Sequence, residues 1–548
     1  MKAGAWLVCT ASLVVGPSAL ASFGGSLVLG RPTATSIAIN AVSDANAAAY
    51  VEYGLVTGVY SNQTGITNLS AGQPVEVVLT GLQPNTRYYY RLRFEYAGYT
   101  TFETDVEHTF HTQRPPGSTF TFCIQGDSHP ERVGKMFDFQ LYSNTLAHAA
   151  ADQPDFYLTI GDDFSVDLIP TNSLNSSNVT YRYVVQRPYL GVIGASAPVF
   201  LVNGNHEQAA AYLLNGTSNN VAVWAQNARN SYYSEPTPDG FYTGNTNPVP
   251  FIGLLRNYYA WTWGDALFVT LDPYWGCPIC VDNVLGDDHS SSAKRTNIWD
   301  VTHGDAQYEW LRTTLEQSRA KYKFVFAHHV LGTGRGGIEE AFDYEWGGYN
   351  VGGGNNQTGT NITTWGFATN RPLWAMPIHQ LMASNHCTIF FQGHDHLFAH
   401  QQLDGVTYQE LPLPADPSNT LYNADAYLTG YVTNSSGYTR VTVSPAQVKV
   451  EYVRMYLPTA ETNGQFSGLI GHSYVIASPQ ISAIAATNGQ AELVLNGTLF
   501  QDHSLQASTN LAEWTTILTT NLAATPVLWR DLGSTNYSRR FYRFGYGP

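Results

Sequence analysis

The sequence predicts a multidomain chain: an N-terminal β-sandwich, a central α/β domain and a small C-terminal all-β module. Short runs that alternate apolar and polar residues dominate residues 25–113, which is typical of antiparallel β-structure. Between residues 120 and 396, apolar strands alternate with helical periodicity, and polar clusters follow the strands. From about residue 478 the alternation returns without such clusters. With 548 residues, 43% of them hydrophobic, the chain can form about two to four domains with sizeable cores.

Residues 1–21 have the composition of a secretory signal. Lys2 precedes an apolar run over residues 5–15, and Ala19-Leu20-Ala21 offers the small residues that favour cleavage after Ala21. A buried first strand is the alternative interpretation. The run is shorter than the ~20 residues that a membrane span needs, and no other stretch of that length is apolar. We therefore expect an exported protein, either secreted, periplasmic or at the cell surface, with no membrane span.

Residues 22–114 form the predicted N-terminal β-sandwich. Runs at 36–39, 49–53 and 75–79 have the length and alternation of its strands. The stretch Gly81-Leu82-Gln83-Pro84-Asn85-Thr86-Arg87-Tyr88 resembles the turn and strand of fibronectin type III domains. No residue of this segment suggests chemistry, so we expect a structural platform. The segment Arg114-Pro115-Pro116-Gly117 marks the boundary with the central domain, which covers residues 115–477.

Five polar clusters, each after an apolar run, organise the central domain. The runs cover residues 120–124, 156–160, 199–202, 324–326 and 388–391. The clusters are Asp127-Ser128-His129, Gly161-Asp162-Asp163, Gly204-Asn205-His206-Glu207, His328-His329 and Gly393-His394-Asp395-His396. Histidine is the commonest metal ligand, and carboxylates accompany it in mixed metal sites. Five strands that end in this way predict a metal site at the strand ends.

The spacing of apolar residues predicts two helices in the central domain. The face of the first is formed by Met136, Phe139, Tyr142, Leu146 and Ala149. The second, from about Gly304 to Ala320, is expected to bury Tyr308, Leu311 and Leu315. Insertions rich in Asn, Ser, Gly and Thr at 171–180, 214–248 and 346–364 are predicted to be loops that shape the cleft. Alternating runs between 405 and 455 predict the strands of a second sheet.

The charge balance bears on the class of partner. The net charge is -15, and no basic stretch compensates for it, which argues against a nucleic-acid backbone as the main partner. The acidic balance does not argue against a small anionic substrate, because bound metal cations would dominate the local field.

The sequence Cys277-Pro278-Ile279-Cys280 has two cysteines at a spacing found in zinc and redox sites. A structural zinc site needs a second pair of ligands nearby, and the sequence has none. We therefore predict a local disulfide, which an exported loop would tolerate. Cys123 and Cys387 lie within apolar strands and are predicted to be buried thiols.

The order Asp-x-His, Gly-Asp, Gly-Asn-His-Glu, His and Gly-His-x-His resembles the calcineurin-like metallophosphoesterases, with the purple acid phosphatases as the nearest branch. The resemblance covers residues 118–455. It implies four layers, α-β-β-α, for the central domain, and an N-terminal domain like that of plant-type purple acid phosphatases. It also implies two metal ions (Fe, Mn or Zn) and hydrolysis of small phosphate mono- or diesters by attack of a metal-bridging hydroxide.

The resemblance also implies a ligand for each metal position. Asp162 would bridge the two metals. Asp127, His129 and His396 would complete one of them, and Asn205, His328 and His394 the other. His329 is the alternative to His328, which we prefer because the family places its ligand at the first residue past the strand.

By the same resemblance, His206 faces the substrate, as a stabiliser of the transition state or as the acid for the leaving group. The alternative is that His206 and Glu207 brace their loop. Arg132, His329 and Arg335 are candidate substrate contacts, and the alternative for both arginines is a solvated position. The run Gly332-Thr333-Gly334-Arg335-Gly336-Gly337 formally fits a dinucleotide-binding loop, but no clear helix follows it.

Ser165 departs from the family pattern. Purple acid phosphatases have Gly-Asp-x-x-Tyr, whose tyrosine phenolate ligates ferric iron and causes the purple colour. Here Ser165 stands at that position, and its hydroxyl is a poor ligand. His129 would replace the phenolate, and a neutral imidazole favours divalent Mn, Zn or Fe.

Residues 478–548 form the predicted C-terminal β module. The run from Ala507 to Trp514 resembles small β modules that end many exported bacterial proteins, and attachment, sorting and a passive tail all remain open. Because β modules flank the central domain, a binding or adhesion protein on a retired phosphatase scaffold is the alternative to an enzyme. We favour the enzyme because all seven ligand positions are filled.

Overall fold

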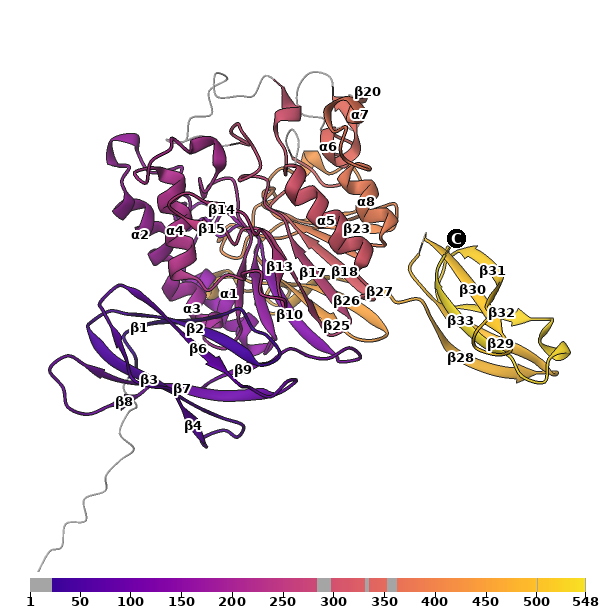
Figure 1. Ribbon diagram of the computed structural model, residues 1–548, viewed down its shortest axis with the longest axis horizontal. Coiled ribbons are helices and arrows are strands. Elements are labelled where there is room, and N and C mark those ends of the chain that lie inside the picture. The colour runs from indigo at the N-terminus through magenta and orange to yellow at the C-terminus, as the bar shows by residue number, and fades with distance from the viewer. Residues whose placement is uncertain (1–21, 283–296, 331–334, 352–361, 500, 548) are drawn as a thin grey trace, which may run out of the picture.

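The computed structural model describes residues 22–282, 297–330, 335–351, 362–499 and 501–547. The predicted secretory signal, residues 1–21, lies outside these ranges. Figure 1 shows N-terminal β-sheets, a larger α/β domain and a C-terminal β module that lies to one side. The predicted multidomain fold is therefore confirmed.

The N-terminal domain packs two antiparallel sheets against each other. One has the order β1-β2-β6, formed by Gly25–Gly30, Ser36–Ser43 and Pro74–Thr80. The other is built from β3 (Ala47–Gly54), β4 (Asn62–Gln63), β5 (Thr67–Leu69), β7 (Arg87–Tyr96), β8 (Glu103–Thr104) and β9 (His108–His111). Every second residue of β7 from Tyr88 to Phe94 is buried, and these side chains meet Leu29 and Ile39 of the other sheet.

The central domain stacks two larger sheets. The first has the order β12-β11-β10-β25-β26-β27, formed by Val199–Leu201, Phe156–Thr159, Phe120–Gln125, Gly437–Val443, Gln447–Arg454 and Leu469–Ala477. The second has the order β13-β16-β17-β18-β21-β23-β22-β24, formed by Thr243–Gly244, Tyr259–Trp263, Ala266–Thr270, Tyr322–Phe326, Ile389–Gln392, Val406–Glu410, Phe398–Leu403 and Tyr431–Thr433. Aromatic rings fill the space between them: the Phe122 centroid lies 5.3 Å from that of Phe268 and 6.2 Å from that of Phe391.

Helices cover the outer faces of both sheets. α1 (Phe139–Ala151) and α3 (Arg187–Gly194) pack on the first sheet, where Leu141 and Ile193 join a cluster with Tyr157. α5 (Asp305–Gln317) and α8 (Ile378–Ser384) cover the second sheet, where Leu311 and Leu381 share a cluster with Val325. The four-layer α-β-β-α arrangement is therefore confirmed.

All five strands expected before the polar clusters are present, as β10, β11, β12, β18 and β21. β10, β11 and β12 pair in parallel, and so do β17, β18, β21 and β23. Because parallel strands end at the same edge of a sheet, the polar residues that follow them come together. This topology positions the site.

The first predicted helix starts later than expected. Asp138 caps α1, and its carboxylate accepts hydrogen bonds from the backbone N–H groups of Gln140 and Leu141 at 2.9 Å. Met136 therefore precedes the helix and Phe139 is exposed, so the predicted face was wrong at both positions. The second helix is confirmed, and it buries the three predicted residues.

Two insertions predicted to be loops contain helices, α2 (Ser176–Val185) and α4 (Val221–Tyr232). Each begins at an asparagine cap: Asn175 Oδ1 accepts from the Asn178 backbone N–H and Asn220 Oδ1 from that of Ala222, both at 3.0 Å. The prediction was wrong there because asparagine starts helices as well as forming turns. In the third insertion, β19 (Tyr349–Val351) pairs with β20 (Ile362–Trp365), and residues 352–361 lie outside the described part of the chain.

The predicted disulfide between Cys277 and Cys280 was wrong, because both residues carry thiols. The Cys277 sulfur lies against Thr302: it accepts from the backbone N–H at 3.0 Å and donates to the carbonyl at 3.1 Å. The Cys280 thiol donates instead to the Asp282 carbonyl at 3.5 Å. The Cys277 sulfur therefore contacts Thr302, whereas the Cys280 sulfur contacts Asp282.

The N-terminal domain is joined to the central domain by buried polar contacts. The guanidinium of Arg187 donates to the Ser26 carbonyl at 3.1 Å, the Asn40 carbonyl at 2.8 Å and the Tyr232 carbonyl at 2.6 Å. Burial lowers the pKa of Arg187 to about 10, which leaves it charged at neutral pH. This contact crosses from the first sheet of the N-terminal domain to α4.

The C-terminal module contains two three-stranded sheets. One is formed by β28 (Gln480–Thr487), β29 (Gln490–Asn496) and β32 (Val527–Asp531), the other by β30 (Asp502–Ser508), β31 (Thr515–Asn521) and β33 (Phe541–Tyr546). Its contacts with the central domain include a hydrogen bond from Gln501 Nε2 to the Gly405 carbonyl at 2.9 Å and the stacking of Tyr546 on His386. No helix in the described ranges combines the length and apolar character needed to cross a membrane.

Candidate metal centre

The five polar clusters meet at the carboxyl ends of the strands, in loops with a tight backbone. His129, Asp162, His394 and His396 all have positive φ angles, between 46° and 75°. Such angles are costly for residues with a side chain and gather at functional sites. The neighbouring Gly393 leaves room for the carboxylate of Asp127, because a Cβ there would lie 2.5 Å from Asp127 Oδ1.

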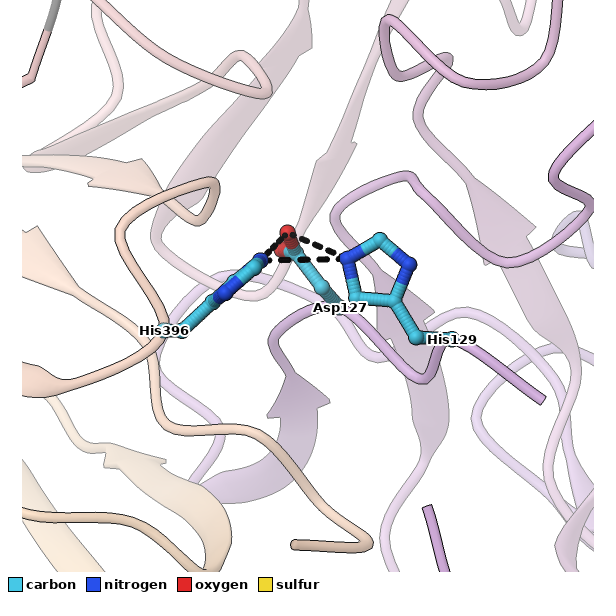
Figure 2. A group of neighbouring side chains, drawn as sticks. All are labelled: Asp127, His129 and His396. Carbon is cyan, nitrogen blue, oxygen red and sulfur yellow. Dashed lines mark hydrogen bonds and ion pairs between the residues drawn. The ribbon is translucent and has the colours of Figure 1, made fainter. Parts of the chain in front are cut away.

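Asp127, His129 and His396 form the first group of possible metal ligands. Figure 2 shows their side chains converging, with Asp127 and His129 from the loop after β10 and His396 from the loop after β21. His396 Nε2 lies 3.0 Å from Asp127 Oδ2 and 3.1 Å from His129 Nε2. His129 Nε2 lies 3.6 Å from the same carboxylate oxygen.

Asp162, His328 and His394 form the second group. His328 Nε2 lies 3.1 Å from Asp162 Oδ2 and 2.9 Å from Asn205 Oδ1. Asp162 Oδ2 also lies 3.9 Å from His129 Nε2, so this carboxylate stands between the two groups. The structure thus brings together all seven residues for which the sequence analysis expected a ligand role.

The donor set and its spacing fit metal ions. Two imidazole nitrogens 3.1 Å apart, both near one carboxylate oxygen, have the separation of neighbouring ligands on a single ion. Burial alone would raise the pKa of Asp127 and Asp162, but the surrounding histidines hold both pKa values well below their usual range. Both carboxylates are therefore ionised, which is the form in which they bind a cation.

His329 lies beside this cluster. Its Nδ1 donates to the Val330 carbonyl at 2.9 Å, and its ring centroid lies 4.8 Å from that of His394. Burial and the neighbouring His328 lower the pKa of His329 to about 4. The geometry therefore favours His328 over His329 as the residue that faces Asp162 and Asn205.

His206 and Glu207 have different surroundings. Glu207 accepts hydrogen bonds from the backbone N–H groups of Asp163 and Gly204, both at 2.7 Å, and so braces two of the loops. His206 Nε2 lies 3.6 Å from Asp162 Oδ2, at the centre of the site. The His206 backbone also braces the loops, because its carbonyl accepts from the Val166 N–H at 2.8 Å and its N–H donates to Asp162 Oδ1 at 2.9 Å. Only the His206 ring faces the centre of the site.

Both candidate arginines contact residues of the site. An Arg132 terminal nitrogen lies 3.4 Å from His206 Nε2. Arg335 donates to the His394 carbonyl at 2.5 Å and pairs with Asp395 at 3.1 Å, so it also supports the loop that carries His394. Residues 331–334 of the glycine-rich run lie outside the described part of the chain.

The sequence analysis missed three carboxylates. Asp167 Oδ2 lies 2.7 Å from His206 Nδ1, and Glu131 Oε1 lies 3.0 Å from His129 Nδ1. Asp282 Oδ2 lies 3.5 Å from His394 Nε2. None of the three carboxylates directly follows an apolar strand, whereas the predicted ligands do. In the sequence, Glu131 is marked only by its position two residues after His129.

Two family models match the chain. Residues 120–398 match the calcineurin-like phosphoesterases, and residues 23–112 match the N-terminal domain of the purple acid phosphatases. Purple acid phosphatase 13 of Arabidopsis thaliana is 25% identical over 241 residues, which are 39% of this chain and 38% of that relative's length. The match thus spans well under half of the length of that curated relative.

Two solved structures share the fold over most of the chain. PhoD has a TM-score of 0.54 at 14% identity, over 92% of this chain and 94% of PhoD. A purple acid phosphatase from yellow lupin (Lupinus luteus) seeds has a TM-score of 0.50 at 14% identity, over 83% of this chain and 74% of that one. The segment matched by the phosphoesterase model is more than half of the chain and contains all seven clustered residues. The chain therefore belongs to the calcineurin-like phosphoesterases, a family of metal-dependent phosphoric ester hydrolases, and its N-terminal domain is of the purple acid phosphatase type.

Proposed function

We propose that this protein is an exported hydrolase that cleaves phosphate mono- or diesters at a centre of two metal ions. The observation that carries the proposal is the place of Asp162, which belongs both to a group with His129 and His206 and to a group with His328 and His394. A carboxylate shared by two ligand groups is what a pair of neighbouring ions requires.

In this proposal, Asp127, His129 and His396 would hold one ion, Asn205, His328 and His394 would hold the other, and both would share Asp162. When bound, such ions supply Lewis acidity to phosphoryl oxygens and a nucleophilic water near neutral pH. The ions are Fe, Mn or Zn, because a mixed set of imidazole, carboxylate and amide donors suits all three.

The chain's own residues bind the ester and move a proton. Arg132 lies next to His206, and its guanidinium binds a phosphoryl oxygen of the substrate. Asp167 holds His206 Nδ1 at 2.7 Å, so Nε2 is the nitrogen that exchanges a proton with the leaving-group oxygen. His206 thus acts as the general acid.

Export rests on the composition of residues 1–21. We expect the mature protein to begin at Ser22. N-terminal sequencing of the protein recovered from outside the cytoplasm tests this, and a mature chain that still carries the apolar run over residues 5–15 would contradict it.

The experiment for the enzymatic function combines metal analysis with turnover of two chromogenic substrates, an aryl phosphate monoester and a bis(aryl) phosphate diester. We expect a purified chain with about two ions to hydrolyse at least one of them. A chain that carries the ions but turns over neither ester would instead support the alternative, a binding or adhesion protein on this scaffold.

A further inference from the structure

Glu131 links two parts of the site that otherwise serve different tasks. Its Oε1 oxygen accepts hydrogen bonds from His129 Nδ1 at 3.0 Å and from Arg132 Nε at 3.3 Å. The Glu131 side chain is 6% exposed and that of His129 is fully buried, so water does not compete effectively for either partner. One carboxylate oxygen thus contacts both a candidate metal ligand and a candidate substrate contact.

The contact with His129 determines which nitrogen faces the metal centre. With the Nδ1 proton held by Glu131, the lone pair of the neutral ring is on Nε2. Nε2 is the nitrogen that lies close to Asp127 and His396. A carboxylate on the far nitrogen of a metal-binding histidine fixes the tautomer and orientation of the ring and raises its basicity.

The contact with Arg132 acts on the substrate side. Glu131 holds Nε of the guanidinium, while a terminal nitrogen reaches His206 Nε2 at 3.4 Å. Two contacts on different nitrogens restrict a side chain that is 24% exposed and would otherwise sample several rotamers. The guanidinium is therefore held beside the proposed general acid before any substrate arrives.

We propose that Glu131 is a positioning residue that aligns the metal-facing nitrogen of His129 and the phosphate-binding guanidinium of Arg132 through one carboxylate oxygen. This rests on the proposed two-metal function. A change at Glu131 must therefore affect two separate measurements, the affinity of one metal site and the binding of the phosphate ester.

The test titrates metal-free protein with Zn²⁺ by calorimetry and then measures KM and kcat for an aryl phosphate. We expect Glu131→Ala to weaken one of the two Zn²⁺ sites by about 10- to 100-fold and to leave the other unchanged. Glu131→Gln, whose amide oxygen still accepts hydrogen bonds, should lose less. Both variants should also raise KM.

Two further variants distinguish the effect of the Glu131–Arg132 contact from that of the Glu131–His129 contact. Arg132→Ala should raise KM while both Zn²⁺ affinities stay at the wild-type values. Glu316→Gln removes a carboxylate from the exposed face of α5, where it pairs with Arg312, and should change neither measurement. Wild-type Zn²⁺ affinity at both sites in both Glu131 variants would overturn the proposal, and so would equal weakening of both sites together with a lowered Tm. Failure of the wild-type protein to bind Zn²⁺ or to hydrolyse esters would instead refute the proposed function itself.

Discussion

His206 is held by side chains that contact different atoms of its ring. Asp167 Oδ2 lies 2.7 Å from Nδ1, while a terminal nitrogen of Arg132 lies 3.4 Å from Nε2. Asp167 is fully buried, so its contact with the ring is shielded from water. The ring is therefore fixed in the orientation that a proton donor in the site needs.

We expect Asp167→Asn to keep both metal ions and to lower kcat by about 10- to 100-fold, because the amide lacks the charge that holds the His206 ring. His206→Ala should lower kcat by about 10²–10⁴-fold. Because Asp167 acts through His206, the double variant should be no worse than His206→Ala alone. Metal analysis and steady-state kinetics of the three variants test this, and a further tenfold loss in the double variant would contradict it.

Ser165 leads to an expectation about colour. Serine does not supply the phenolate to which the purple absorption is assigned, and its side chain is buried. We expect the protein loaded with iron to be colourless and active. His129→Ala should lose metal, whereas Ser165→Ala should keep it. A tyrosinate-to-iron band in the visible spectrum of the wild-type protein would refute this account.

The seven clustered residues were predictable because each follows a strand, and parallel strands bring their ends together. Asp167 and Glu131 were not, because their roles depend on how a loop returns to the site. Asp167, for example, lies five residues past Asp162 and contacts a histidine of another cluster. The Cys277–Cys280 prediction failed for a similar reason, since spacing alone does not reveal that Thr302 contacts the first sulfur.

At the scale of the elements, Glu345 ties together three helices on the outer side of the second sheet. It lies on α6 (Tyr344–Gly347) and is buried. His303 Nδ1, just before α5, lies 2.7 Å from its Oε1, and Arg371, which ends α7 (Phe367–Asn370), lies 2.9 Å from its Oε2. Burial alone would raise the pKa of Glu345, but His303 and Arg371 lower it below its usual value.

We expect Glu345→Gln to lower the free energy of unfolding by about 3 kcal/mol at neutral pH, because Arg371 loses its buried counter-charge. The folded pKa lies below the unfolded value of about 4.3, so the ionised group stabilises the fold fully above that pH. The contribution is lost as pH falls through the folded pKa. Denaturant unfolding of both proteins should show a constant difference at neutral pH that shrinks below about pH 4.3. A difference that grows on acidification would contradict this.

The strands themselves and the second helix were predictable at this scale because buried elements repeat apolar residues with a fixed period. The sheet to which strands belong was not: the runs at 437–454 were expected in a second sheet, but β25 pairs with β10 in the first. α2 and α4 were not, because their segments are rich in polar residues and start at asparagines that are equally common in turns. Packing decides such cases: Val179 and Tyr183 of α2 and Ala225 of α4 share one buried cluster.

At the scale of the whole molecule, the two flanking β regions are attached differently. The N-terminal domain shares buried polar contacts with the central domain, such as those of Arg187 and a hydrogen bond from Tyr90 to the Ala195 carbonyl at 2.6 Å. The C-terminal module makes the contacts described at Gly405 and His386. Figure 1 shows this module to one side of the α/β domain.

We expect a chain that ends at Ser478 to keep the metal content, kcat and KM of the full chain, because no residue of the centre lies in the module. Loss of the Tyr546–His386 stack should cost about 1 kcal/mol and lower Tm by no more than about 5 °C. Calorimetry and kinetics on both chains test this. A shortened chain that folds but has lost turnover would show that the module contributes to the site.

We propose that Asp162 joins two metal sites into one catalytic centre. The most direct test is the metal content of wild-type protein and Asp162→Asn, measured by inductively coupled plasma mass spectrometry together with phosphate-ester turnover. We predict about two ions per wild-type chain, at most about one in the variant, and no turnover without the carboxylate. An Asp162→Asn protein that keeps two ions and wild-type turnover would contradict the account.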